Sequence, residues 1–231
     1  SESMSKSKKN VIDPEEMINT YGADSVRLFI LSDSPPERDI QWSQEGVSAA
    51  YKFIQKLWKL NKDIFNLDKS SSENNDAIDK AINKTIHSIT KNLENFQYNV
   101  VVANIYEFYN IINIHVASKK VSKKKLLSAW EKMLLLLMPL IPHFANECWE
   151  KYEKDFYWPK YDPNFLIEKE CTIVVQINGK KRGLFKMPTD SKEKLIIENA
   201  KKLDNVKKNI SNLKIIKNIY IKNKLINFIV K

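Results

Sequence analysis

The chain has 231 residues, of which 43% are hydrophobic and 29% are charged, and its net charge is +10. This composition is typical of a soluble globular protein with one large or two modest hydrophobic cores. The longest apolar run, Met133–Ile141, contains a proline and is shorter than the ~18 residues of a membrane span, so neither a membrane span nor a signal peptide is expected. Because Cys148 and Cys171 are isolated and neither has a CxxC partner, neither a disulfide framework nor a thiolate zinc site is expected. Both cysteines are predicted to be buried apolar positions of a cytoplasmic protein.

The excess of positive charge is confined to the last quarter of the chain. Residues 169–231 contain 16 Lys and Arg but only five Asp and Glu, which gives this segment a net charge of +11. Residues 1–168 contain 22 Lys and Arg and 23 Asp and Glu, so their net charge is −1. A concentrated excess of this kind indicates a binding partner, and its size matches the electrostatic footprint of a nucleic-acid-binding module. The alternative is that a genome rich in asparagine and lysine codons has filled the protein surface with lysine.

The first elements in the chain are predicted to be two short helices. Asp13-Pro14-Glu15-Glu16 combines an N-cap, a proline at the first helical position and a glutamate at the third, so a helix begins there and ends at Gly22. A second helix over residues 23–31 is rich in apolar residues, and Pro35-Pro36 stops it.

Helical spacing then dominates as far as residue 152. From Ser43 to Phe65 the apolar positions describe one long amphipathic helix. Its other face carries Lys52, Lys56, Lys59 and Lys62, which are either a solvated surface or contacts for phosphates. Residues 68–76 contain no apolar side chain and are predicted to be a flexible connection. Helical spacing resumes over 78–93, 99–117, 122–138 and a last helix that ends near residue 152.

These segments predict a mainly α fold, an antiparallel helical bundle followed by a small α+β C-terminal domain. Trp58 and Trp130 lie on apolar stripes and are assigned to the core of the bundle; the alternative is that they are platforms for base stacking. After Pro163 the pattern changes to a β-branched strand over 171–177, an Asn178-Gly179 hairpin turn and a returning strand over 183–187. Helices over 191–202 and 205–210 and strands over 214–221 and 225–230 complete this domain.

Few residue patterns indicate catalysis. His87, His115 and His143 lie on separate helical stretches rather than at metal-ligand spacing, and we expect them to be core or interface side chains. The chain contains no nucleophile elbow, Walker loop or dinucleotide fingerprint. The run Met4-Ser5-Lys6-Ser7-Lys8-Lys9, however, places ammonium groups and hydroxyl donors just ahead of a helix, a pattern suited to phosphate oxygens.

Several motifs together resemble one enzyme family. Residues 4–16, Tyr21-Gly-Ala-Asp-Ser-Val-Arg27 and Pro35-Pro-Glu-Arg-Asp39 resemble the signature-loop region of class I aminoacyl-tRNA synthetases, most closely the bacterial-type leucyl-tRNA synthetases. The likeness extends through Met138-Pro-Leu-Ile-Pro-His-Phe-Ala-Asn-Glu-Cys-Trp149, Trp158-Pro-Lys-Tyr-Asp162 and Val174-Val-Gln-Ile-Asn-Gly-Lys-Lys-Arg-Gly183. The Val-Gln-Ile-Asn-Gly hairpin, at this distance from the loop, separates the chain from the valyl, isoleucyl and methionyl relatives.

The resemblance implies that the chain is the C-terminal part of a longer enzyme, cut just before its signature motif and inactive alone. Residues 1–42 would be the signature loop and the end of the catalytic domain, 43–155 the anticodon-binding-type bundle, 156–168 a linker and 169–231 the basic tRNA-binding domain. The family motif is Lys-Met-Ser-Lys-Ser, so ATP would contact Met4, Ser5, Lys6 and Ser7, with Lys6 as the catalytic lysine. Ser3 replaces the first lysine of the motif.

The resemblance also implies substrates and partners. The intact enzyme would activate leucine with ATP and Mg²⁺ and transfer it to the 3′ end of tRNA(Leu), as a cytoplasmic monomer; no metal ligand is visible in this chain. The bundle would support the tRNA stem, and Lys180, Lys181 and Arg182 would be the best-placed contacts for the outer corner of the tRNA, which is recognised by shape and backbone. The alternatives are a free-standing tRNA-binding module without catalysis and a class I synthetase for valine or isoleucine.

Overall fold

The computed structural model describes residues 2–67, 76–167, 169–211 and 213–231. The chain divides into two compact units, Ser1–Leu166 and Ile167–Lys231, which we call the helical unit and the C-terminal unit. The connection that the sequence predicts over residues 68–76 lies outside the described residues, except for Asp76.

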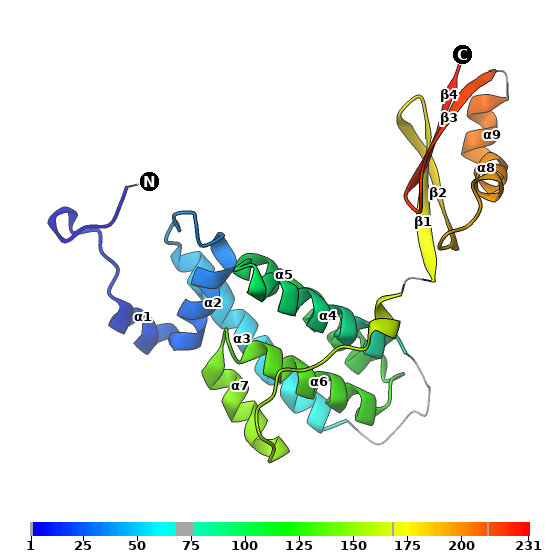
Figure 1. The fold of residues 1–231 in the computed structure, drawn as a ribbon. Helices are drawn as coiled ribbons and strands as arrows, with labels where there is room; N and C mark the ends of the chain where they lie inside the picture. The colour runs from blue at the N-terminus through cyan, green and yellow to red at the C-terminus, as the bar shows by residue number, and fades with distance from the viewer. Residues whose placement is uncertain (1, 68–75, 168, 212) are drawn as a thin grey trace. The chain divides into compact units, whose positions relative to one another are not determined.

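The helical unit is an antiparallel bundle, as the sequence predicts (Figure 1). Its helices are η1 (Lys6–Lys8), α1 (Pro14–Tyr21), α2 (Ala23–Asp33), α3 (Gln44–Phe65), α4 (Ala77–Glu94), α5 (Tyr98–Ser118), α6 (Lys123–Leu137), α7 (Pro142–Trp149), η2 (Glu150–Tyr152) and η3 (Pro163–Leu166). Among the described residues, no helix is both long enough and apolar enough to cross a lipid bilayer.

The helix starts follow local chemistry that the sequence displays. The carboxylate of Asp13 accepts a hydrogen bond from the Glu15 N–H at 2.9 Å, and the Ser43 hydroxyl accepts one from the Gly46 N–H at 3.0 Å. Each bond satisfies a backbone donor that the first helical turn leaves unpaired. Gly22 ends α1 at a φ of 82°, a left-handed conformation in which a β-carbon would be strained.

The core of the helical unit is continuous along the bundle. Trp130 is fully buried, as predicted, and its indole N–H donates to the Asn61 side-chain oxygen at 2.7 Å. The prediction that Trp58 belongs to the core is wrong, because 37% of this side chain is exposed. Helical spacing places Trp58 at the border of the apolar stripe, where its ring packs edge-to-face on Phe144 at a centroid distance of 4.9 Å.

One buried hydroxyl in this unit has no hydrogen-bond partner among the described residues. It belongs to Tyr152, whose ring stacks on Trp149 at a centroid distance of 5.2 Å. Because an unpaired buried hydroxyl costs free energy, Tyr152→Phe should raise the free energy of unfolding by up to about 1 kcal/mol.

Asn61→Leu, which leaves the Trp130 N–H unpaired, should lower the free energy of unfolding by about 1 to 3 kcal/mol.

Urea unfolding followed by tryptophan fluorescence measures both effects, since all five tryptophans lie in the helical unit. A Tyr152→Phe variant that unfolds at clearly lower urea would mean that the hydroxyl has a hydrogen-bond partner in solution.

The C-terminal unit is a four-stranded sheet with two helices packed on one of its faces (Figure 1). Its elements are β1 (Glu170–Ile177), β2 (Lys180–Pro188), α8 (Glu193–Lys202), α9 (Asp204–Ile210), β3 (Ile215–Ile221) and β4 (Leu225–Val230). The strand order is β2-β1-β4-β3, with β1 and β4 parallel and both hairpins antiparallel.

The core of this unit follows the alternation of strand residues. Ile173, Val175 and Ile177 of β1 point to the same side as Ile226 and Phe228 of β4, and all five are buried. Ile196 and Ala200 of α8 and Val206 of α9 cover them. The predicted fold class, a mainly α bundle followed by a small α+β domain, is confirmed.

Candidate functional site

Residues 3–10 fold into a compact loop closed by Asn10. The Asn10 side chain accepts a hydrogen bond from the Ser5 N–H at 2.9 Å and donates one to the Ser3 carbonyl at 3.3 Å. The Ser5 hydroxyl caps η1 by accepting from the Lys8 N–H at 3.3 Å. These bonds fix the backbone of the loop and leave most of its side chains in solvent.

The loop presents its lysines differently. Lys8 forms an ion pair with Glu2 at 3.3 Å, which offsets part of its charge. The side chain of Lys6 is exposed, and its ammonium has no hydrogen-bond or ion-pair partner in the part of the chain that the structure describes. Met4 and Ser7 are also exposed, and Ser5 is half-buried. The ammonium group of Lys6 is therefore available to an anion such as a phosphate.

A pair of charged side chains joins the segment after this loop to the end of the bundle. Asp24 of α2 is buried, and its carboxylate accepts hydrogen bonds from the N–H groups of His143 and Phe144 at 3.3 and 2.7 Å. Arg27, one turn later, donates to the carbonyls of Pro139 and Leu140 at 2.8 and 3.1 Å.

We call Asp24 and Arg27 the α2 clasp. The cap residue of α7, Ile141, makes no side-chain capping bond, so Asp24 supplies that cap from more than a hundred residues earlier in the chain. A carboxylate at this end of a helix is also favoured by the helix dipole. The clasp therefore fixes the turn between α6 and α7 to α2, the helix that follows the loop of residues 3–10 and α1.

The three basic residues that the sequence singles out lie at the start of β2. Lys180, Lys181 and Arg182 are all exposed and follow the Asn178-Gly179 turn, whose φ angles are 47° and 80°. Gln176 pairs with Lys181 and Val175 with Gly183, so Arg182 is the extra residue of a β-bulge. The predicted strand over 183–187 thus begins three residues earlier, at Lys180.

The turn is tied to the last strand of the chain. The Asn178 side chain donates to the Val230 carbonyl at 3.1 Å and accepts from the Val230 N–H at 3.0 Å. The Gly179 N–H also donates to the Asn227 side chain at 3.1 Å. The hairpin that carries the basic cluster is consequently held by β4 on a rigid support.

Asn178→Ala should destabilise the C-terminal unit by about 1 to 3 kcal/mol, because it removes both bonds to Val230 and because alanine tolerates the positive φ at this position less well than asparagine. Asn178→Gly removes the same bonds without the backbone strain and should be less destabilising. Hydrogen exchange of the Val230 amide in each variant measures the difference. Equal exchange in the unaltered chain and Asn178→Ala would contradict the assigned role of the side chain.

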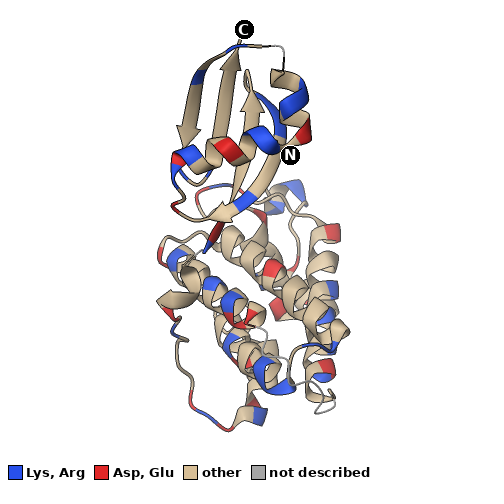
Figure 2. Ribbon diagram, turned by 90° about the vertical axis from the view of Figure 1, so that its right-hand side faces the viewer, with Lys and Arg blue, Asp and Glu red and all other residues tan. Residues whose placement is uncertain are grey.

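Positive charge is spread over the C-terminal unit beyond this cluster. Lys and Arg recur along its helices and strands, with few acidic residues between them (Figure 2). The lysines of α8 and α9 are exposed. One of the unit's cations is neutralised locally, since Lys222 pairs with Asp190 at 2.7 Å and thereby lowers the pKa of that carboxyl.

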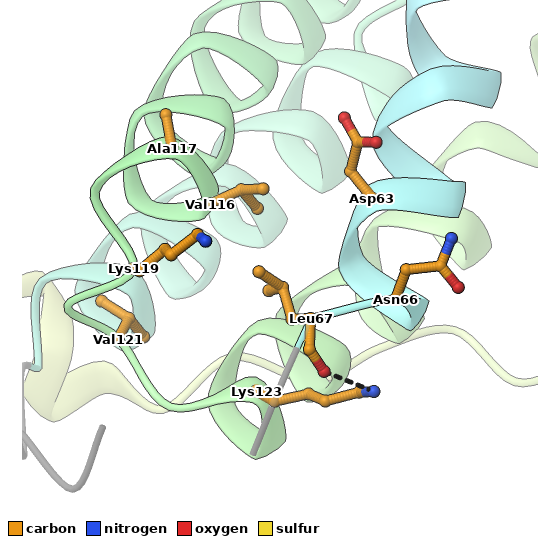
Figure 3. A pocket seen from close by; sticks show the side chains of 8 residues that line it. All are labelled: Asp63, Asn66, Leu67, Val116, Ala117, Lys119, Val121 and Lys123. Carbon is orange, nitrogen blue, oxygen red and sulfur yellow. Dashed lines mark hydrogen bonds between the residues drawn. The ribbon is translucent and has the colours of Figure 1, made fainter. Parts of the chain in front are cut away.

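The helical unit contains several hollows. One hollow of about 300 Å³ lies beside the end of α3 (Figure 3). There the Lys123 ammonium donates to the carbonyls of Phe65 and Leu67 at 2.6 and 2.8 Å, and Asp63 is paired with Lys59. Within the described ranges, no group of three or more His, Cys, Asp or Glu side chains is placed to hold a metal ion.

The cysteines and histidines differ in part from their predicted environments. Cys148 is buried, and burial raises the pKa of its thiol to about 12, so it is not a nucleophile at neutral pH. Cys171 is only half-buried, because it lies where β1 begins, which corrects the prediction. His87 and His115 are half-buried, as expected for interface positions. His143 is exposed instead, with its Nδ1 2.9 Å from Asp24.

Comparisons with known proteins connect these features. A family model described as the anticodon-binding domain of tRNA ligase matches residues 75–197, more than half of the chain. The chain belongs to this family. A second model, of the class I tRNA synthetases for isoleucine, leucine, methionine and valine, matches residues 2–43, which include the signature loop and the α2 clasp.

Several relatives of this chain are named leucine–tRNA ligase. Those of Fusobacterium nucleatum and Fervidobacterium nodosum are each 37% identical, over 100% and 99% of this chain. One from Cereibacter sphaeroides is 38% identical over 81% of it. The chain spans 29%, 29% and 22% of the length of these three proteins. The resemblance to class I synthetases seen in the sequence is thereby confirmed.

A solved structure shares the fold of this family member. The LeuRS of Agrobacterium radiobacter K84, crystallised in a ternary complex with tRNA and LeuAMS, aligns with a TM-score of 0.79 and 22% identity, over 99% of this chain and 31% of that one. Sequence reasoning found the loop and the basic hairpin but missed the α2 clasp. The sequence signal for the clasp was a charged pair, Asp24 and Arg27, one turn apart at the start of a helix that is rich in apolar residues.

Proposed function

We propose that the intact protein containing this chain is a leucine–tRNA ligase that activates leucine with ATP and transfers it to the 3′ end of tRNA(Leu). The observation that carries the proposal is the 37% identity to proteins of this name over essentially the whole chain. A cytoplasmic location and a monomeric state belong to the same proposal. So does the division into the signature-loop segment (1–42), bundle (43–155), linker (156–168) and basic domain (169–231).

In this proposal Lys6 acts during leucine activation. The carboxylate oxygen of leucine attacks the α-phosphorus of ATP, a new P–O bond forms, and the bond to the β-phosphate oxygen breaks to release pyrophosphate. Negative charge grows on the departing pyrophosphate, so an exposed, unpaired ammonium stabilises the transition state more than the ground state. Met4, Ser5 and Ser7 complete the nucleotide contact of the loop.

Magnesium would neutralise phosphate charge in such a reaction. The described residues offer no cluster of ligands for it, and no step here is assigned to a metal.

The tRNA contacts of the proposal lie on both units. The bundle supports the tRNA, and the C-terminal unit binds its phosphate backbone through Lys180, Lys181 and Arg182. Exposure of all three side chains on a hairpin fixed to β4 supports this assignment. Contacts with an RNA corner rely on shape and backbone charge more than on base edges, which suits cations on a rigid turn.

Changing Lys180, Lys181 and Arg182 together to glutamine tests the RNA-binding part. Binding of the chain to a tRNA(Leu) transcript should weaken, and the slope of log K against log salt should become shallower by about 2 to 3, since each lost phosphate contact removes somewhat less than one unit. A triple change of the exposed bundle lysines Lys119, Lys120 and Lys124 is the charge-matched control. If the hairpin variant and the unaltered chain have the same salt slope, the three basic residues of the hairpin do not bind tRNA phosphates.

A further inference from the structure

The bundle has an open groove beside the exposed tryptophan. Its volume is about 520 Å³, and it is lined by Gln55, Trp58, Lys62 and neighbouring residues of α3 together with Lys151 of η2. The structure packs α3 against α7, the helix that η2 continues. This groove, which we call the Trp58 groove, therefore joins side chains that lie almost a hundred residues apart in the sequence.

Trp58 offers a supported aromatic surface to this groove. One side of its indole is held by the edge-to-face contact with Phe144, which is itself buried, while 37% of the side chain remains exposed. Burying an indole fully would have been more favourable for folding, because the transfer of apolar area from water stabilises the core. A tryptophan that is held firmly but left partly exposed is well suited to packing against a planar ligand at a small cost in side-chain entropy.

The charges around this indole are positive. Of the described residues that line the groove, none is acidic. Lys59 is paired with Asp63, but Lys62 is exposed without a partner in the described chain. The Lys151 ammonium lies 4.9 Å from the centre of the Phe65 ring and has no ion-pair partner among the residues that the structure describes. Gln55 adds hydrogen-bonding capacity through its amide.

We propose that the Trp58 groove is an RNA contact site, separate from the basic hairpin, in which Lys62 and Lys151 bind backbone phosphates and Trp58 packs against a base or ribose. Cations that follow a backbone beside an aromatic platform are the combination with which proteins hold nucleic acid strands. The carboxylates of an acidic peptide would use the lysines but would offer the indole no aromatic ring, whereas every nucleotide joins a ring to a phosphate. The inference rests on the proposed function, because it assumes that the chain binds tRNA.

The experiment measures binding of the full chain to a tRNA(Leu) transcript as salt is varied. Lys62→Gln with Lys151→Gln should weaken binding about tenfold and make the salt slope shallower by about 1.5 to 2. Trp58→Leu, which keeps an apolar contact with Phe144 but removes the indole, should weaken binding about tenfold with little change in slope. Lys119→Gln with Lys124→Gln, on exposed lysines outside the groove, is the matched control and should leave both quantities unchanged.

Several outcomes would overturn the proposal. An unchanged slope in the Lys62 and Lys151 variant would do so, and so would a Trp58→Leu variant that stays folded by its remaining tryptophan fluorescence and binds tRNA normally. Loss of binding to polyglutamate in parallel with tRNA would show a general anion surface instead. If the unaltered chain binds no tRNA, the proposed function is contradicted as well. If the unaltered chain binds tRNA and the groove variants bind it equally well, only the proposal for the groove is contradicted.

Discussion

Lys6→Ala in the intact enzyme should slow leucyl-adenylate formation by about 30- to 1000-fold, with little change in the affinity for leucine. This range corresponds to the loss of about 2 to 4 kcal/mol of transition-state stabilisation, typical of removing one charged group that faces developing negative charge. The ammonium of Lys6 is exposed and unpaired among the described residues, and Ser3 stands where the motif has another lysine. ATP–pyrophosphate exchange measures the effect.

The matched control for this prediction is Lys9→Gly. It removes one charge from the same loop, and glycine tolerates the left-handed backbone at this position, where φ is 51°. The loss of activity should be much smaller than for Lys6→Ala. If Lys6→Ala exchanges pyrophosphate as fast as the unaltered enzyme, Lys6 has no role in leucine activation.

Asp24→Ala should lower the free energy of unfolding of the helical unit by about 3 kcal/mol. The change leaves the N–H groups of His143 and Phe144 without their shared acceptor, and hydrogen bonds to a charged group contribute more than neutral ones. It also removes the only side-chain cap that α7 has among the described residues. Urea unfolding followed by tryptophan fluorescence reports this unit selectively.

Asp33→Ala is the control for the clasp, because Asp33 is an exposed aspartate on the same helix. Its effect should be within about 0.5 kcal/mol, as is usual for surface substitutions. If Asp24→Ala and Asp33→Ala unfold at the same urea concentration, the capping role assigned to Asp24 is wrong.

The sequence predicted the secondary structure well because helix periodicity and capping are local. Asp13-Pro14, Ser43 and Gly22 each mark a helix end through contacts within a few residues. The same is true of the Asn178-Gly179 turn, whose conformation depends on its own two residues. Errors of two or three residues occurred where an element continues beyond its apolar stretch, as at the end of α2 and the start of β2.

Features that depend on distant residues were not predictable in this way. The exposure of Trp58 depends on how far Phe144 covers it, and the cap of α7 depends on Asp24. The attachment of Asn178 to Val230 likewise joins residues 52 positions apart. A single sequence contains each of these residues but not their pairing.

The candidate site was predicted mainly through the family resemblance. A lysine–serine run at the start of a chain is usually a solvated tail, and only the motifs around it indicated a nucleotide loop. The structure adds that Asn10 closes this loop and that Glu2 forms an ion pair with Lys8, which distinguishes Lys6 from Lys8. Neither pairing could be read from composition.

The most direct test of the account is aminoacylation by the intact enzyme that contains this chain. Leucine, valine and isoleucine would each be offered with ATP and with transcripts of their cognate tRNAs. The account predicts that leucine is attached to tRNA(Leu) in strong preference to the other pairs. Preferential charging with valine or isoleucine, or an intact protein that binds tRNA and forms no aminoacyl adenylate, would contradict it.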